Sequence, residues 1–396
     1  MNKKLLVLAY SGGLDTSYCL KKLSSDGHEV HAVSVNTGGF SNNEINSIKE
    51  KAHHMGAHVY KNIDALSSFY NNIVKYLIFG NILKNNTYPL SVSAERIIQA
   101  IEIVRYAKKI GAKYIAHGST GAGNDQVRFD LIFQVMAPEI EIITLIRDLQ
   151  LSREDEITYL KSQGIDIAWE KAQYSVNQGL WGTSVGGSET LTSNLPLPEK
   201  AYPSVLKNKK PTQISIGFKK GEITTLNGKR RDSVNLIQEL QEVAKGYAIG
   251  RDIHVGDTII GIKGRVGFEA AAPLIILKAH HLLEKHTLTK WQLFQKEQLG
   301  NFYGMLLHEG NYLDPVMRDI EAFLESSQTH VSGTIMVALH PYRFELLGTQ
   351  SDHDLMQAQF GNYGEMNKDW TASDAKGFIK ITANAHKIFK SINKNI

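Results

Sequence analysis

This chain of 396 residues contains one cysteine and no long apolar run. The single thiol, Cys19, excludes a disulfide framework, a zinc site built on thiolates, and persulfide chemistry that needs a second thiol. No run reaches the roughly 20 apolar residues of a membrane-spanning helix, and residues 1–4 lead directly into an apolar segment without a signal peptide. These absences predict a cytoplasmic protein with no membrane partner.

An excess of charge of one sign is also missing. The chain has 44 basic and 40 acidic residues, and its compact basic stretches, 207–210 and 230–231, lack interleaved aromatic residues. Such stretches are typical of solvated loops, so we expect no nucleic-acid partner. The histidine pairs at 53–54 and 280–281 have neither cysteine partners nor the spacing of a metalloprotease helix. We therefore predict no metal site in the protein itself.

The most specific pattern present is Ala-Tyr-Ser-Gly-Gly-Leu-Asp-Thr-Ser over residues 9–17, directly after an apolar run. Its two glycines let the backbone approach an anion, and its hydroxyl groups lie at the positive end of the following helix. No lysine follows the glycines, so this is not a Walker loop. It resembles instead the pyrophosphate loop of ATP pyrophosphatases, which split ATP between the α and β phosphates. We assign the reaction to Ser11, Asp15, Thr16 and Ser17.

Short apolar runs alternate with helical stretches in the first part of the chain. This alternation predicts an α/β domain with a doubly wound parallel sheet, whose ligands bind at the carboxyl ends of the strands. We expect strands at 5–8, 30–35, 58–63, 114–116 and near 140–145, with helices at 44–55 and 94–110 and a further helix capped by Ser152 and Asp155.

The pattern changes at a stretch rich in Gly, Ser, Thr and Pro, residues 173–203. We predict a nucleotide-binding domain at residues 1–168, a second, α+β domain at 169–370, and a C-terminal helical arm at 371–396. The apolar residues of the arm recur at helical spacing on a segment too short to stand alone, so it packs either on its own subunit or on a neighbour. In the second domain we expect strands at 214–218, 222–226, 258–263 and 334–339, and helices at 234–244 and 279–296.

A second polar segment, residues 117–129, follows the predicted strand ending at Ala116. Its three glycines precede an amide, a carboxylate and a guanidinium group within one turn. Asp125 can pair with an ammonium group, Arg128 can bind a carboxylate in bidentate fashion, and Asn124 can both donate and accept. These groups suit a zwitterion such as an amino acid.

In this order and spacing, the two segments resemble those of the argininosuccinate synthase family, and the similarity extends over essentially the whole chain. The resemblance implies an adenine nucleotide alpha hydrolase-like domain followed by a synthetase domain. It also implies an ATP-dependent ligase of arginine biosynthesis that joins citrulline to aspartate and releases AMP and pyrophosphate. Its relatives are usually homotetramers, and their ATP is bound as the magnesium complex.

The same resemblance assigns residues to each substrate. ATP would be lined by Ala9, Tyr10, Ser11, Gly12, Gly13, Leu14, Asp15, Thr16, Ser17, Val35, His117 and Gly118. Aspartate would be held by Thr120, Asn124 and Asp125, and citrulline by Tyr88, Ser93, Asn124, Arg128, Ser175 and Ser184.

The expected chemistry needs no nucleophile from the protein. A urea carbonyl is a poor electrophile, so its oxygen must first attack the α phosphate of ATP, giving an adenylated intermediate that the aspartate amine then attacks. Catalysis would consist mostly of positioning and charge stabilisation. A glutaminase-dependent synthetase or a tRNA thiolation enzyme would need further thiols, and a nucleotide sensor without activity would not need Asn124, Asp125 and Arg128.

The chain departs from the family at two positions. Gly256 and Asp257 stand where members commonly have Glu followed by Asn, and Phe268 stands where they have Tyr before Glu269. Both missing groups are expected near the α-amino end of citrulline. An alternative acceptor, a citrulline acylated on that nitrogen, therefore stays open.

Overall fold

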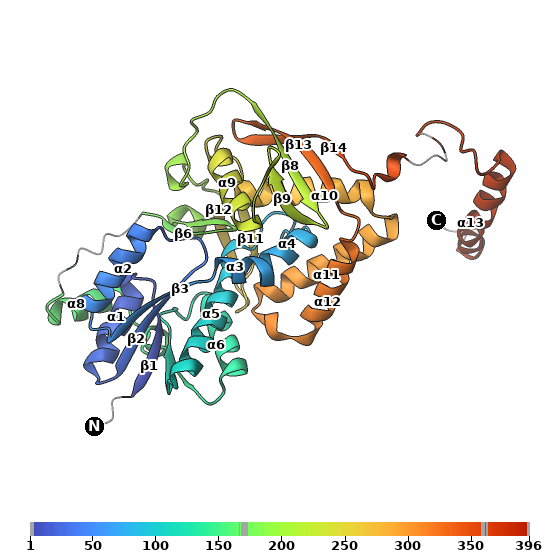
Figure 1. Ribbon diagram of the computed structural model, residues 1–396. Helices are drawn as coiled ribbons and strands as arrows, with labels where there is room; N and C mark the ends of the chain where they lie inside the picture. The colour runs from blue at the N-terminus through green and yellow to red at the C-terminus, as the bar shows by residue number, and fades with distance from the viewer. Residues whose placement is uncertain (1–3, 166, 168–172, 358–360, 362, 394–396) are drawn as a thin grey trace.

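Five parallel strands form the centre of the first half of the molecule (Figure 1). The computed structural model describes residues 4–165, 167, 173–357, 361 and 363–393. The strands lie in the order β3-β2-β1-β4-β5. Successive strands are added on one side of β1 up to β3 and on its other side from β4, so the strand order switches between β1 and β4. Ligands of doubly wound sheets bind at such a switch point. Their bounds are β1 Leu5–Ala9, β2 Glu29–Asn36, β3 Val59–Asp64, β4 Tyr114–Ala116 and β5 Glu141–Ile143.

Helices cover both faces of this sheet, as alternating side chains of β1 require. Leu6 and Leu8 pack in one cluster with α1 and α8, whereas Val7 packs in another with α5. The predicted α/β fold is confirmed, although the helix expected from residue 94 already begins at Ser91. The helices are α1 Leu14–Ser25, α2 Asn42–His54, α3 Leu66–Phe69, the π-helical turn Tyr70–Val74, α4 Lys75–Phe79, α5 Ser91–Ile110, α6 Asp125–Met136, α7 Leu145–Asp148 and α8 Arg153–Ser162.

Two antiparallel sheets and four long helices form the second half, which confirms its α+β class. The four-stranded sheet has the order β11-β12-β7-β6 and the five-stranded sheet the order β10-β9-β8-β13-β14. The bounds are β6 Ser175–Gly179, β7 Gly182–Gly186, β8 Thr212–Lys219, β9 Glu222–Leu226, β10 Lys229–Arg230, β11 Arg251–Asp257, β12 Lys263–Glu269, β13 Gly333–His340, β14 Arg343–Gln350, α9 Ser233–Lys245, α10 Ala271–Thr287, α11 Lys290–His308 and α12 Pro315–Ser327.

Two predicted elements of the second half are wrong. The helix expected over 279–296 is two helices, because Leu288 is extended and Thr289 starts α11 with a capping box to Gln292. The strand expected over 258–263 is mainly the turn between β11 and β12. Thr258 closes that turn with backbone and side-chain hydrogen bonds of 2.8 Å to the carbonyl oxygen of Ile262.

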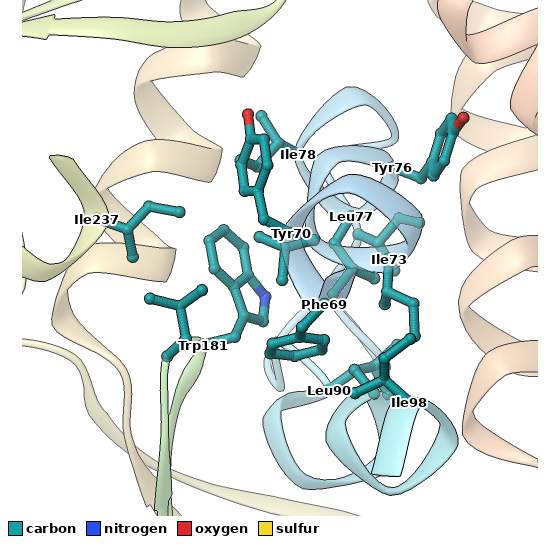
Figure 2. Close-up of a cluster of buried hydrophobic side chains, with 14 of the residues drawn as sticks. Phe69, Tyr70, Ile73, Tyr76, Leu77, Ile78, Leu90, Ile98, Trp181 and Ile237 are labelled. Carbon is teal, nitrogen blue, oxygen red and sulfur yellow. The ribbon is translucent and has the colours of Figure 1, made fainter. Parts of the chain in front are cut away.

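One hydrophobic core joins the two halves (Figure 2). Trp181, between β6 and β7, is fully buried in the same cluster as Phe69 and Tyr70 of the first half and Ile237 of α9. The boundary predicted at 168–169 falls at residues outside the described ranges, and both domain boundaries stay predictions. The sheet that carries Trp181 is held against the nucleotide-type domain by apolar packing.

The C-terminal helix α13, Ala372–Ile392, stands away from the rest of the chain (Figure 1). None of its residues is buried. Apolar side chains remain exposed along it, with exposed fractions of 71% for Phe378, 76% for Ile381 and 59% for Phe389. Of the two packing arrangements expected for the arm, docking on its own subunit is not present in this structure.

Candidate active site

The loop after β1 turns tightly into α1. Gly12 has a φ of +77°, and a side chain there would also meet Ile48 at 3.1 Å, so the position requires glycine. Gly13 precedes the helix without a capping side chain, which leaves the N–H groups of the first turn open to a ligand. The hydroxyl groups of Ser11 and Thr16 lie 3.2 Å apart at the exposed side of this turn. The geometry is that of an anion site.

Other predicted residues of this loop are buried beneath it and hold it in place. Ser17 is fully buried, and its hydroxyl lies 3.3 Å from that of Tyr10. The carbonyl oxygen of Tyr10 accepts a 2.6 Å hydrogen bond from Ser34 of β2. Leu14 and Val35 are also buried, so their side chains contribute packing and only their backbones can face a nucleotide.

Two groups beside the loop were not foreseen from the sequence. The Lys51 ammonium group, from α2, donates a 3.0 Å hydrogen bond to the Gly12 carbonyl oxygen, and burial lowers its pKa. From α8, the Glu156 carboxyl group interacts with that of Asp15, and burial together with this neighbour raises the Glu156 pKa to about 8. Neither residue belongs to a local motif, because each reaches the loop from a different helix.

The second predicted segment meets the first directly. A side chain at Gly118 would lie 3.2 Å from the backbone of Asp15 and Thr16, so the two loops touch through the backbone. The preceding His117 is buried, with Nε2 2.8 Å from Asp130 and Nδ1 accepting a 3.1 Å hydrogen bond from the Ser119 N–H. The His117 side chain therefore holds the loop in place rather than facing a ligand.

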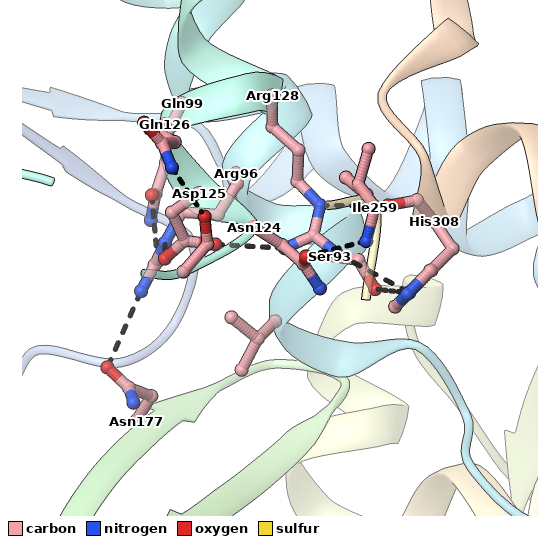
Figure 3. A network of polar contacts seen from close by, with 12 residues as sticks. Ser93, Arg96, Gln99, Asn124, Asp125, Gln126, Arg128, Asn177, Ile259 and His308 are labelled. Atoms are coloured by element: carbon pink, nitrogen blue, oxygen red, sulfur yellow. Dashed lines mark hydrogen bonds and ion pairs between the residues drawn. The ribbon is translucent and has the colours of Figure 1, made fainter. Parts of the chain in front are cut away.

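A network of charged groups follows this loop (Figure 3). Asp125 forms ion pairs of 2.8 Å with Arg96 and 2.9 Å with Arg128. Burial raises the pKa of Asp125, but the charges of the two arginines outweigh it and lower the pKa overall. Arg128 also donates a 3.0 Å hydrogen bond to the carbonyl oxygen of His308. Asp125, predicted to pair with an ammonium group, and Arg128, predicted to bind a carboxylate, thus form an ion pair with each other in this structure.

Asn124 connects this loop to the second half of the molecule. Its side-chain oxygen accepts a 2.9 Å hydrogen bond from the Ile259 N–H in the β11–β12 turn. Thr120, predicted with Asn124 for aspartate, is exposed at the start of the loop. The turn and the loop together close one side of a pocket.

This pocket has a volume of about 220 Å³ and brings together five of the six side chains predicted for citrulline. They are Tyr88, Ser93, Asn124, Arg128 and Ser184. The sixth, Ser175, lies on β6 with an exposed side chain and does not line the pocket. The lining that the sequence did not point to includes Val92, His254, Arg265, Val266 and His308.

The described residues contain no group of three or more His, Cys, Asp or Glu side chains that could hold a metal ion. None of the described helices combines the length and the apolar character needed to cross a membrane.

The parallel sheet carries an uncapped glycine loop at its switch point, as nucleotide-binding sheets do. One core joins this sheet to an antiparallel domain that completes a polar pocket. Together these features define a HUP-domain enzyme. Residues 5–166 match the family described as the arginosuccinate synthase N-terminal HUP domain, and residues 174–389 match the C-terminal domain of the same enzyme.

Curated relatives agree with this match. The chain is 36% identical to the argininosuccinate synthase of Methanocaldococcus jannaschii, with 96% of each chain covered. It is 36% identical to that of Dictyoglomus turgidum with the same coverage, and 33% identical to that of Xanthomonas campestris over the whole of both chains. The chain belongs to the argininosuccinate synthase family and is therefore a ligase of arginine biosynthesis.

Proposed function

We propose that this chain joins citrulline to aspartate with ATP, through a citrulline adenylate, releasing AMP and pyrophosphate. The observation that carries the proposal is the backbone contact of Gly118 with Asp15 and Thr16. A phosphate at the first loop and a ureido group in the pocket behind the second would be neighbours. Such positioning supports in-line attack without a protein nucleophile.

In the first step, the ureido oxygen attacks the α phosphorus and the bond to pyrophosphate breaks. In the second, the aspartate amine attacks the ureido carbon, loses a proton, and AMP leaves. The N–H groups of the first turn of α1, the hydroxyls of Ser11 and Thr16, and the Lys51 ammonium would stabilise the departing pyrophosphate. Magnesium entering with ATP would neutralise phosphate charge, and Asp15 is the carboxylate at the loop that fits it.

The amino-acid assignments are part of the same proposal. Thr120, Asn124 and Asp125 would bind aspartate, and Arg128 with the pocket hydroxyls would bind citrulline. Asp125→Asn is expected to raise the KM for aspartate, and Arg128→Leu that for citrulline. Equal effects of both variants on both substrates would contradict separate amino-acid subsites.

The nucleotide products test the reaction itself. Chromatography of reactions with ATP and aspartate is expected to show AMP and pyrophosphate only when a citrulline is added. ADP as the main product would overturn the proposal, because the loop lacks the lysine that follows the glycines in loops for terminal-phosphate transfer.

We further propose a cytoplasmic homotetramer in which α13 packs on a neighbouring subunit. The exposed apolar face of α13, including Phe378, Ile381 and Phe389, supports this, because such a face is seldom left in water. Sedimentation of the full chain and of a chain ending at residue 370 tests it. The full chain is expected to be the larger assembly, and equal assembly states would contradict a role for the arm.

A further inference from the structure

The pocket behind the second loop carries an excess of positive charge. Its lining includes the residues Arg128 and Arg265, two histidines and a single carboxylate, Asp257. The Arg265 guanidinium is held by the backbone carbonyl oxygens of residues 189, 192 and 195, and no described carboxylate lies within ion-pair distance of it. Lys84, close enough to lower the pKa values of His254 and His308, adds a further cation.

Three carboxylates near the pocket lie beside cations. Asp257 lies 2.6 Å from Lys263, with both side chains largely exposed. Glu269 is buried and lies 2.8 Å from Arg251, on the other side of β12 from Phe268. Asp125 is shared by two arginines, as described above. Among the described residues, Asp257 is therefore the one carboxylate in the pocket lining, and the charges of Lys263 and Lys84 both already act on it.

His254 occupies the space where a side chain at residue 256 would lie. A Cβ atom built at Gly256 is 2.7 Å from His254 Nε2 and 3.4 Å from Asn85 Nδ2. The imidazole stacks on Tyr88 with ring centroids 5.3 Å apart. Burial, and then the charge of Lys84, lowers the His254 pKa. A neutral imidazole brings no negative charge to pair with an ammonium group, whereas an amide can satisfy both its donor and its acceptor.

The strand pair beside His254 contributes two glycines to the pocket lining. Gly256 of β11 pairs with Gly264 of β12, and both line the pocket without side chains. His308, also in the lining, stays neutral as well, because burial and the charges of Arg128 and Lys84 lower its pKa to about 3. The pocket thus combines neutral hydrogen-bonding groups with fixed cations.

We propose that the acceptor preferred by this pocket is a citrulline acylated on its α-nitrogen. The inference rests on the ligase reaction proposed above and leaves its reacting atoms unchanged. Acylation replaces the ammonium with an amide, which removes a cation from a site that has several cations and a single carboxylate, Asp257, on which two lysines already act. An acyl chain that ends in a carboxylate would also gain attraction from Lys84.

The test compares three acceptors at saturating ATP and aspartate by the release of pyrophosphate: citrulline, N-acetylcitrulline and N-succinylcitrulline. We expect kcat/KM to be about tenfold or more higher for the acylated acceptors, highest for the succinyl compound. A preference for free citrulline would overturn the inference and leave the proposed function standing. Failure of all three acceptors to release pyrophosphate would instead overturn the proposed function.

Two sets of variants test whether His254, Gly256 and Lys84 cause the preference for an acylated acceptor. His254→Ala/Gly256→Glu, which makes room for a carboxylate, is expected to shift the preference towards free citrulline, whereas its uncharged control His254→Ala/Gly256→Gln is not. Equal shifts in both would overturn the charge argument. Lys84→Gln is expected to lower the succinyl-to-acetyl ratio of kcat/KM, and an unchanged ratio would remove Lys84 from the site.

Discussion

Single residues at the active site act across large distances in the chain. Lys51 reaches Gly12 from α2, and Asn124 reaches Ile259 in the other half of the molecule. The two glycine loops could be predicted because their residues are adjacent in sequence and their chemistry is local. Lys51, His254 and His308 could not, because a lone lysine or histidine on a helix or strand carries no signal of what the fold brings next to it.

Replacement of Lys51 is expected to weaken catalysis. Lys51→Met removes an ammonium group at the proposed pyrophosphate site and should lower kcat/KM for ATP by about a hundredfold. Lys49→Met, on the exposed side of the same helix, is the matched control and should behave as wild type. Steady-state kinetics with varied ATP decide this. A loss of the same size in both variants would point to a general effect on α2 instead.

Glu156 should make stability depend on pH. Its pKa rises from 4.5 in the unfolded chain to about 8, through burial and the neighbouring Asp15. The folded state therefore retains a proton that the unfolded chain loses, so this contribution is complete below pH 4.5 and is lost as the pH rises through 8. Between pH 6 and 9, the thermal midpoint should fall more in wild type than in Glu156→Gln. Parallel curves for the two proteins would rule out this role.

At the level of elements, regular alternation of apolar runs was sufficient to predict the parallel sheet. The strands β6 and β7 were not predicted, because Ser, Thr, Asn and Gly fill them and their apolar pattern is weak. The break between α10 and α11 was missed because neither glycine nor proline marks it, while the capping box at Thr289 decides where the second helix begins.

The β11–β12 turn should depend on its tether. Asn124→Ala removes the acceptor for the Ile259 N–H and is expected to speed exchange of that amide hydrogen by about tenfold. Asn124→Asp keeps an acceptor oxygen and should retain the protection. Hydrogen exchange measured by mass spectrometry over residues 258–262 checks this in the ligand-free enzyme. Equal protection of the Ile259 amide in all three proteins would show that hydrogen bonds within the turn are sufficient to order it.

On the scale of the whole molecule, the two halves share one core. Trp181 packs between helices of both, and its indole N–H has no hydrogen-bond partner among the described residues. The stabilisation it provides is therefore apolar contact. Such a core predicts that the halves unfold together and not as separate domains.

Trp181→Ala should lower the free energy of unfolding by about 3–5 kcal/mol, and Trp181→Phe by less, because the smaller ring still fills part of the space. Urea unfolding followed by circular dichroism and by loss of activity measures both variants. In wild type the two probes should give one coincident transition. Separate transitions would contradict the shared core.

The contact at Gly118 bears on how this enzyme could change over evolution. Since the two loops meet through their backbones, the spacing between the phosphate site and the pocket does not depend on any side chain that selects the acceptor. Substitutions on β11 and β12 can then alter which molecule is accepted while the path of the reaction stays the same. The residues that carry out the reaction and the residues that select the acceptor can therefore evolve independently.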